Sequence, residues 1–523
     1  MKKKSYQRKS EVSRKNFIKN SANVSLLALM PGIEYPFHRT GAKFTYMNSW
    51  PKFKDNSTSF QKAKDKTSSF CWQLAAFSYK CEISELAPPV INKAKLAVID
   101  YISALCAGAK YGEISPLIRD FARKVGGIKE SSIIGDRQRC PAVIAAMANS
   151  TISHSAELDD GHRFGTSHPA VTIIPTAISL AERTKCTGKE LLVAIIVGYD
   201  VMLRIATAIN PGHWSRGFHS TGTCGAIGAS ATAAKILRLD RTKTMHAISM
   251  GALQSAGLQE MLYSNPMIKP LQAGKAALAG VVSGELARSS ARSPSTVFEG
   301  PLGFFNAMTD EVDYNCLRDK LGERFEIERT YFKFYPTCRH VHCSIDLVRK
   351  ILNENPFSAD MVESVKVRTY TIAAKEVGSS AYPQNSDEAM FSIPYAVSVW
   401  LHENRFTPDE LGRQFLARQD IKKTARKVTI KADKHWDAKY PEARGATVII
   451  QLKDGRVFEE SRELPYGEPE NLDNDIRLVK KYEDYTDGVL SRKDAQKLLD
   501  YVQHLELKKN IILIAETLSN ADV

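Results

Sequence analysis

Four basic side chains stand where the sequence is expected to start a helix. His168 and Lys269 each precede a proline, which favours the first helical position, and His219 precedes a run of small residues. Lys333 lies just ahead of another helical pattern. A helix N-terminus already carries about half a positive charge, so a cation there is unfavourable unless an anion binds. If the four segments converge, they predict a site for a polyanion such as a di- or tricarboxylate.

The same positive fields should lower the pKa values of these histidines and lysines and make them proton carriers near neutral pH. The alternative interpretation is that each is an ordinary surface or hydrogen-bonded residue. Only convergence of the four segments would distinguish a site from four unrelated basic residues.

A second concentration of polar residues is the segment HSAELDDGH at 154–162. Glu157 and Asp160 are three residues apart and share a face if the preceding helix persists that far. Gly161 is expected to end that helix. A carboxylate near His168 could orient it or take a proton itself, and the alternative is a solvated acidic helix end.

A third group follows Lys333. Arg339 and His342 fall in the first turns of the expected helix. Cys338, His340, His342 and Cys343 contain metal-ligating side chains, but their spacing is too tight for a standard zinc site. We therefore expect no metal.

The periodicity of the chain is mainly helical up to about residue 330. Helical patterns cover 93–107, 141–155, 170–184, 191–208, 225–237 and 274–288, and the last two are rich in Ala, Gly and Ser. Small residues let helices approach closely, so these two should be central. The GxxGxxG at 222–228 follows no strand and indicates helix packing rather than a nucleotide loop.

Strand patterns follow at 364–371, 427–431, 446–453 and 456–460, with helical patterns at 336–353, 388–403 and 491–504. Asp454-Gly455 supplies the tight turn of a hairpin. We expect a mainly α protein with a large all-helical domain and an inserted, smaller α+β domain. The expected ranges are 68–331 for the helical domain, 332–468 for the inserted domain and 469–523 for a helical segment that rejoins the first domain.

Composition excludes several classes of protein. Apolar residues make up 43% of the 523 residues, which indicates a globular chain. No run of the sequence reaches the roughly 20 apolar residues that a membrane span needs, so we expect no membrane-spanning segment. The net charge is +14, but residues 1–67 hold 15 Lys/Arg against 4 Asp/Glu, and the body is nearly balanced. This distribution argues against a nucleic-acid partner. Nine cysteines without a CxxC pair do not indicate a disulfide framework.

The N-terminal extension, residues 1–67, has two interpretations. Residues 13–19, SRKNFIK, resemble a Tat-like signal with Lys15 in place of the second arginine, and an apolar stretch follows at 24–33. Export to the periplasm is one alternative. A cytoplasmic protein with a basic tail is the other, and the sequence leaves both open.

Several segments, in order, resemble the MmgE/PrpD family. They are HSAELDDGHRFGTSHPAVTIIPTAISLAE (154–182), GYDVMLRIATAI (198–209), RGFHSTGTCGAIGASATAAKILRLD (216–240), KPLQAGKAALAG (269–280), KFYPTCRHVHCSID (333–346), EAMFSIPYAVSVWL (388–401) and YGEPENL (466–472). The resemblance covers about residues 70–523. It implies a helical domain with an α+β lid, a homodimer, a site between the domains, and no metal or organic cofactor.

By position, the resemblance assigns catalytic roles to His168, His219, Lys269 and Glu157. The substrate-binding residues are then Lys333, Arg339 and His342, to which we add Asp160. The family often has Asp at position 157 and Thr at position 161, where this chain has Glu157 and Gly161. The active-site tyrosine of the decarboxylase lid has no clear match, and Ala374 falls near it.

The function that follows is a cofactor-independent lyase that removes a proton next to a carboxylate of a small di- or tricarboxylate. A 2-methylcitrate dehydratase-like hydro-lyase is the first hypothesis. The alternatives are a cis-aconitate decarboxylase-like or iminodisuccinate epimerase-like enzyme. A non-catalytic carboxylate-binding protein is a further alternative from another class.

Overall fold

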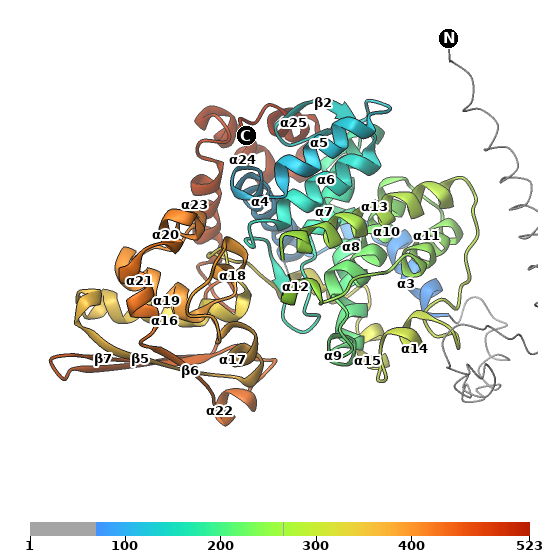
Figure 1. Cartoon of the computed structure of the whole chain (residues 1–523). Coiled ribbons are helices and arrows are strands. Elements are labelled where there is room, and N and C mark those ends of the chain that lie inside the picture. Colours follow the sequence, from blue (N-terminus) through green and yellow to red (C-terminus); the bar gives the residue numbers. More distant parts are fainter. Residues whose placement is uncertain (1–68, 265) are drawn as a thin grey trace, which may run out of the picture. The chain divides into compact units, whose positions relative to one another are not determined.

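The computed structural model describes residues 69–264 and 266–523, and the expected N-terminal extension with its Tat-like pattern lies outside them. Residues 69–329, the first described part of the chain apart from residue 265, are mainly helical (Figure 1). Its helices of eight or more residues are α3 (Phe70–Lys80), α4 (Pro88–Tyr111), α5 (Ser115–Val125), α6 (Ala142–His154), α7 (Ala170–Thr184), α8 (Gly188–Ile209), α10 (Ser220–Ile236), α11 (Arg241–Leu253) and α13 (Lys269–Arg288). The shorter ones are α9 (Gly212–Ser215), α12 (Met261–Ser264), α14 (Phe304–Met308) and α15 (Tyr314–Arg318).

Small residues bring the central helices together, as the sequence predicts. A Cβ on Gly280 of α13 would lie 2.3 Å from the Ala229 Cβ of α10. A Cβ on Gly228 would lie 2.6 Å from the Met202 Cβ of α8. Since both distances are below any real contact between carbon atoms, α10 can pack against α8 and α13 only with glycine at these positions.

The second part of the chain contains a four-stranded sheet with strand order β6-β5-β7-β8. The strands are β5 (Val362–Thr369), β6 (Val428–Ala432), β7 (Ala446–Leu452) and β8 (Val457–Arg462). β5 is parallel to β6 and antiparallel to β7, and β7 and β8 form the expected hairpin, with Gly455 at φ 92° in its turn.

Helices α16 and α19 contact the sheet and lie along one side of it in Figure 1. The helices of this part are α16 (Arg339–Glu354), α17 (Thr371–Val377), α18 (Ser386–Met390), α19 (Ile393–Glu403), α20 (Arg413–Leu416), α21 (Gln419–Ala425) and α22 (Lys434–Asp437). Their apolar side chains form a core of their own, which includes Val341, Val365 and Val448.

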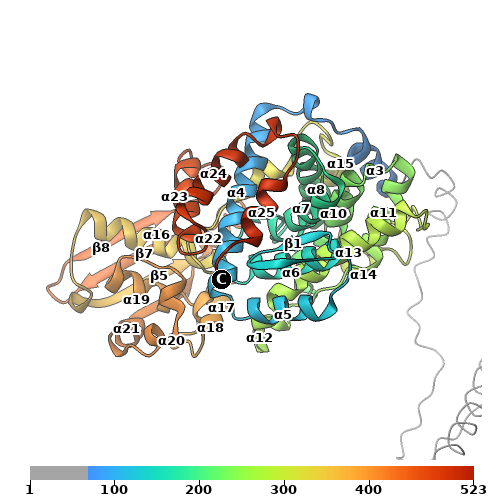
Figure 2. The same cartoon turned by 90° about the horizontal axis from the view of Figure 1, so that it is seen from above.

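The last helices return to the first core. They are α23 (Asn474–Thr486), α24 (Arg492–Gln503) and α25 (Ile512–Ser519), and Leu478, Leu498 and Ile514 are buried in the same core as α4 and α8. Figure 2 shows α24 and α25 beside α4.

Three expectations are wrong in detail. The helical part is not all-helical, because β1 (Ser131–Ile133) pairs with β2 (Asp136–Cys140), and β3 (Gly161–His162) pairs with β4 (Thr330–Tyr331). The helix expected at 388–403 is two helices, because the Ser392 side chain caps a new helix that begins at Ile393.

The third correction concerns apolar runs. Among the described residues one helix, α8, is long and apolar enough to cross a membrane by length and composition. Its most apolar window is 94% buried inside the protein, as expected of the central helix of a packed core.

The close approach of α10 and α13 gives a stability prediction. Gly280→Val places a branched side chain where the Ala229 Cβ already lies, so we expect the free energy of unfolding to fall by about 1–3 kcal/mol, or more if the backbone cannot shift. Urea denaturation measures it. The matched control is Leu286→Val on the same helix, where the side chain is 46% exposed and the change should stay within about 0.5 kcal/mol. Equal midpoints for the two variants would contradict the packing argument.

Candidate active site

The site begins in the loop that follows α6. The helix ends at His154, so Glu157 and Asp160 do not share a helix face and Gly161 does not end the helix, contrary to expectation. Glu157 has φ 52°, in the left-handed region that non-glycine residues rarely adopt. This backbone conformation turns the chain out of the helix direction at Glu157, and such strain is often found at functional sites.

The Glu157 carboxylate is shared by two buried lysines from distant parts of the sequence. Lys269 Nζ donates to Glu157 Oε1, and Lys333 Nζ donates to Oε2 at 2.9 Å. All three side chains are buried, and that of Lys333 is fully so. Two ammonium groups around one carboxylate leave one positive charge without a partner inside this group.

Lys269 is the first residue of α13 and has the lowered pKa that the sequence predicts. Burial, with the Lys333 ammonium contributing, lowers its pKa from 10.5 to about 7. The sequence argument relied on the helix N-terminus, whereas burial is the main cause in the structure. Lys269 Nζ also lies 5.4 Å from the centre of the Phe391 ring.

Asp159 links two histidines. His154 Nδ1 lies 3.0 Å from both Asp159 oxygens, and His168 Nδ1 lies 3.1 Å from Asp159 Oδ2. Burial opposes ionisation of Asp159, but His154, Lys333 and His168 hold the pKa of that carboxyl well below its usual range. The His154 and His168 ring centres are 5.0 Å apart. Asp159 is therefore a fully buried carboxylate between two imidazole rings.

The hydrogen bonds of His168 fix its tautomer. His168 Nδ1 lies 2.7 Å from the carbonyl oxygen of Asp160, and a carbonyl only accepts. Nδ1 therefore carries the proton, and Nε2 has a free lone pair. The side chain is 16% exposed, whereas the Asp159 side chain is fully buried. His168 Nε2 can thus accept a proton from a bound molecule.

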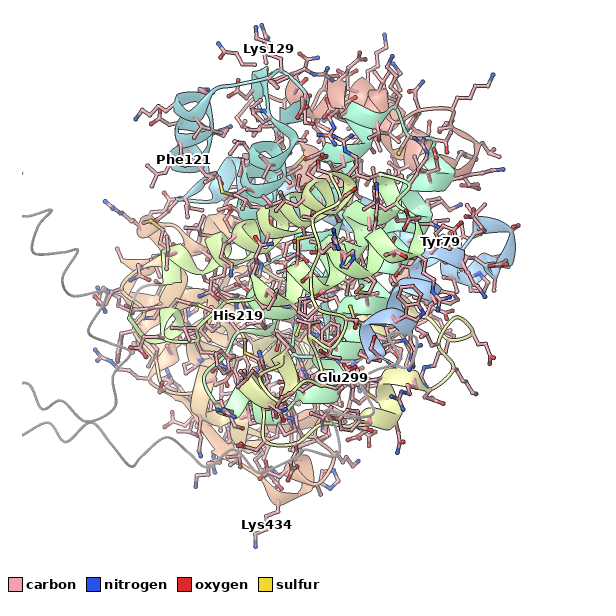
Figure 3. The ribbon with its side chains drawn as sticks, turned by 90° about the vertical axis from the view of Figure 1, so that its right-hand side faces the viewer. Tyr79, Phe121, Lys129, His219, Glu299 and Lys434 are labelled. Carbon is pink, nitrogen blue, oxygen red and sulfur yellow. The ribbon has the colours of Figure 1, made fainter. Side chains whose placement is uncertain are left out.

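His219 has the same tautomer for a different reason. Gln272 Nε2 donates to the Leu258 carbonyl at 2.8 Å, which turns Gln272 Oε1 towards His219 Nδ1 at 2.9 Å. His219 Nδ1 must then be the donor, and Nε2 is again a free acceptor. Burial lowers the pKa of His219 to about 3, with His154 contributing, so the ring is neutral. In Figure 3 His219 lies in the interior of the view, whereas Lys129 and Lys434 project at its edges.

His219 is itself the N-cap residue of α10. Ser220 and Thr221, which follow it, are the first two helical residues. Thr221 Oγ1 accepts a hydrogen bond from the backbone N–H of His168 at 3.1 Å. This bond ties the segment that carries His168 to the start of the helix that carries His219.

Two further residues named from the sequence, Asp160 and Arg339, have their polar atoms bound within the protein. Asp160 accepts from the Ala170 N–H and from the Tyr199 hydroxyl, both at 2.9 Å, and burial raises its pKa to about 7. Arg339 donates to Glu468 Oε1 at 2.9 Å and to backbone carbonyls that include that of Tyr466.

His342 Nδ1 lies 3.2 Å from Arg339 Nη1. Burial, with Arg339 contributing, lowers the pKa of His342 well below its usual value. Substrate binding by Asp160, Arg339 and His342 stays a prediction. The polar atoms of Asp160 and Arg339 are engaged within the protein, whereas His342 Nε2 is buried without a hydrogen-bond partner among the described residues.

The cysteines and histidines of segment 338–343 have separate partners. His340 Nδ1 contacts the Tyr370 hydroxyl, Cys343 Sγ lies 3.5 Å from the Arg462 carbonyl, and His342 contacts Arg339. Over residues 69–264 and 266–523, no group of three or more His, Cys, Asp or Glu side chains could hold a metal ion. Metal independence stays a prediction.

A cavity of about 610 Å³ lies close to the loop of Glu157 and the start of α13, although Glu157, Lys269 and Lys333 do not line it. Ala156 and Pro270, the sequence neighbours of Glu157 and Lys269, line it from the helical part. Asp387, Met390 and other residues of 383–422 line it from the second part. The space is large enough for a small polycarboxylate.

Sequence reasoning named the segment that contains His154 and Asp159 but gave neither a role. The ring of His154 is fully buried, 6.4 Å from that of His219 and nearly parallel to it, and its Nε2 has no hydrogen-bond partner among the described residues. Burial lowers its pKa to about 3. The only sequence signal was the density of acidic residues and histidines in 154–162, which does not reveal which of them face each other.

A helical protein that buries lysines, histidines and carboxylates together in this way has the groups needed for proton transfer beside a carboxylate. The MmgE/PrpD N-terminal domain matches residues 72–317, and the MmgE/PrpD C-terminal domain matches residues 335–507. The chain belongs to the MmgE/PrpD family.

Two kinds of relative are similar to the chain. Cis-aconitate decarboxylase of Aspergillus terreus is 24% identical over 460 residues, which is 83% of this chain and 93% of the relative. The mitochondrial 2-methylcitrate dehydratase of Yarrowia lipolytica is 23% identical over 286 residues, 52% of this chain and 55% of the relative. Both relatives are lyases.

The lowered pKa of Lys269 gives a prediction about stability. Between about pH 7 and 10.5 the unfolded chain holds a proton on Lys269 that the folded protein has released. The wild-type free energy of unfolding should therefore rise with pH in this window, and the cost of burying the charge is fully present below it. Lys269→Met removes that cost, so it should gain stability relative to wild type near pH 6.5 and lose the gain near pH 10.

Urea midpoints at several pH values provide the measurement, and the exposed Lys124→Met serves as the control. A difference between Lys269→Met and wild type that did not change with pH would rule out titration of Lys269 in this range.

Proposed function

We propose that this protein is a cofactor-independent lyase that acts on a small di- or tricarboxylate by removing a proton next to a carboxylate. The observation that carries the proposal is the pair of buried lysines on one carboxylate, beside a histidine whose Nε2 is free to accept a proton. The unpaired positive charge favours an anionic ligand, and the family's named relatives act on polycarboxylates.

The proposed reaction is a dehydration. His168 Nε2 takes the proton from the carbon next to a substrate carboxylate, and the C–H electron pair moves into that carboxylate to give an aci-carboxylate. Lys333 and Lys269 lie where their positive charge would stabilise the new negative charge. The electron pair then forms the C=C bond as hydroxide leaves from the neighbouring carbon. Lys269, with a pKa of about 7, gives that hydroxide a proton, and water departs.

Dehydration needs both a base and an acid, whereas loss of CO2 needs only an acid to protonate the carbanion. The site has a candidate for each, which favours a hydro-lyase of the 2-methylcitrate dehydratase type. Decarboxylation is the second candidate, because the similarity to cis-aconitate decarboxylase extends over 83% of the chain. An iminodisuccinate epimerase-like reaction needs the same first step.

The domain arrangement is part of the proposal. We infer that residues 332–468 act as a lid over residues 68–331 and that 469–523 complete the helical domain. The separate apolar core of the sheet part and the cavity lined from both parts support a lid. The family resemblance adds a homodimer, which sedimentation equilibrium would test.

Proton NMR in D2O with 2-methylcitrate, cis-aconitate and iminodisuccinate tests the function. Loss of water from 2-methylcitrate, with new olefinic signals, is the expected result. Loss of CO2 from cis-aconitate would show that the reaction is a decarboxylation and not a dehydration. Deuterium exchange without net conversion would indicate an epimerase. Binding of all three without turnover or exchange would leave a carboxylate-binding protein and end the enzyme proposal.

His168→Gln should lower kcat by about 10²–10⁴-fold with little change in the substrate dissociation constant, because it deletes a proton carrier. Proton NMR time courses of the reaction measure kcat, and isothermal titration calorimetry measures the substrate dissociation constant. The control is His435→Gln on the exposed surface of α22, which should leave both unchanged. An unchanged kcat in His168→Gln would remove the histidine from the mechanism.

A further inference from the structure

Arg444 is a buried arginine without an anionic partner. The residue is 5% exposed and precedes β7. Its Nη2 donates to the Arg163 carbonyl at 2.8 Å, and its Nε has no hydrogen-bond partner. Within the described part of the chain, no Asp or Glu forms an ion pair with it. A buried charge without a counter-ion costs free energy, so the structure leaves a place where an anion would be favourable.

Two other buried arginines, Arg204 and Arg339, have carboxylate partners. Arg204 donates to Asp200 at 2.6 Å and to the carbonyls of Asp319 and Arg324, both at 2.7 Å. Arg339 has Glu468. Arg444 lacks such a partner, as does Arg119, whose buried Nη1 also has no hydrogen-bond partner among the described residues.

Two carboxyl groups, Glu468 and Glu376, interact electrostatically with Arg444 but form no ion pair with it. Glu468 already accepts from Arg339 and from Arg163, at 2.9 Å and 3.2 Å. Glu376 lies 3.5 Å from His340 Nε2, and burial raises its pKa to about 7 even though Arg444 acts in the opposite direction. Neither carboxyl group forms an ion pair with the guanidinium.

Tyr331 is within electrostatic range of both Arg444 and Lys333. Arg444 Cζ is 5.8 Å from the centre of the Tyr331 ring. Burial raises the pKa of the Tyr331 hydroxyl, while Arg444 and Lys333 both act to lower it. No described residue forms a hydrogen bond with this hydroxyl, although the residue is only 3% exposed.

Gly161 allows Tyr331 to occupy this position. β3 and β4 pair Gly161 with Tyr331, and a Cβ on Gly161 would lie 2.3 Å from the Tyr331 hydroxyl oxygen. Any other residue at 161 would displace the phenol ring. The absence of a side chain at 161 therefore brings a hydroxyl group over the same loop that carries Glu157.

We propose that Arg444 and Tyr331 form a second carboxylate subsite, which binds a carboxylate of the substrate other than the one held by Lys269 and Lys333. The inference rests on the proposed function, because it assigns a partner to a further carboxylate of the same polycarboxylate. The guanidinium supplies two-point recognition of the planar carboxylate, and the phenol hydroxyl donates to one of its oxygens.

Two measurements on ligand-free and ligand-bound protein test the subsite. Arg444→Met removes an unpaired charge and keeps apolar volume, so its Tm without ligand should be at or above the wild-type value. Arg339→Met removes the partner of Glu468 Oε1 and leaves that buried carboxylate oxygen unpaired, so it should lower the Tm clearly. A fall in Tm for Arg444→Met as large as that for Arg339→Met would overturn the proposal, because it would make Arg444 a structural residue.

Isothermal titration calorimetry with citrate and acetate as probes gives the second measurement. Arg444→Met should weaken citrate binding by about 10- to 100-fold and leave acetate binding nearly unchanged. Tyr331→Phe, which removes only the hydroxyl, should weaken citrate binding by a smaller factor. The control is Arg456→Met in the exposed hairpin turn, which should bind citrate as the wild type does.

Lys269→Met separates this proposal from the proposed function. If Lys269→Met loses citrate affinity while Arg444→Met and Tyr331→Phe keep it, the subsite is wrong and the lysine site stands. If citrate does not bind the wild type, or binds all variants equally, both the carboxylate site and the subsite are wrong.

Discussion

One carboxylate shared by two buried ammonium groups is the interaction on which the site depends. Glu157 accepts from Lys269 and Lys333, which come from the start of α13 and from the segment before α16. With one negative charge against two positive ones, the group by itself carries a net positive charge, which the buried Asp159 carboxylate offsets in part through Lys333. The lowered pKa of Lys269 follows from this imbalance and from burial, and so does the preference for an anionic ligand.

The position of Glu157 has to be held from several sides, because its backbone conformation is unfavourable by itself. Asp160 caps α7 through the Ala170 N–H and accepts from Tyr199 of α8. Lys481 of α23 donates to the Leu158 carbonyl and to Asp100 of α4, the latter at 2.6 Å. The C-terminal helices are thus required for a loop more than 300 residues earlier in the chain. The same loop presents Gly161 to Tyr331, so one strained segment links the lysine pair with the proposed second subsite.

The periodicity of the sequence was sufficient to predict the elements that depend on local patterns. The helix at 170–184 and the hairpin around Asp454-Gly455 lie where apolar spacing and turn chemistry place them. The pair β1–β2 was not predicted, because strands of three and five residues with charged side chains in the second carry no alternation. The break between α18 and α19 was also missed, since apolar residues continue across Ser392 and only its capping bond reveals the new helix.

The site, like the fold, was predictable only where its signal is local in the sequence. Basic residues at helix starts were visible as a pattern, and the structure brings Lys269 and Lys333 together on Glu157. The partners that decide their behaviour are not local: Gln272 orients His219, and Asp159 faces two histidines only because the loop folds back. Arg444 lies 281 residues from the carbonyl that holds it, so no spacing rule could have assigned it to this region.

The environments of the titratable groups in the site give them widely different pKa values. This difference limits which of them can carry protons. Burial keeps His154 and His219 neutral, with pKa values of about 3, and neighbouring imidazoles and Lys333 keep Asp159 ionised. Asp160 has a pKa of about 7, but both of its oxygens are hydrogen-bonded inside the protein. Lys269 combines a pKa near neutrality with a place beside the cavity, and His168 combines a free Nε2 with access to solvent. An acid and a base are therefore selected from a cluster of eight ionisable side chains, Glu157 included, by burial and hydrogen bonding. The rest of the cluster supplies a fixed field around them.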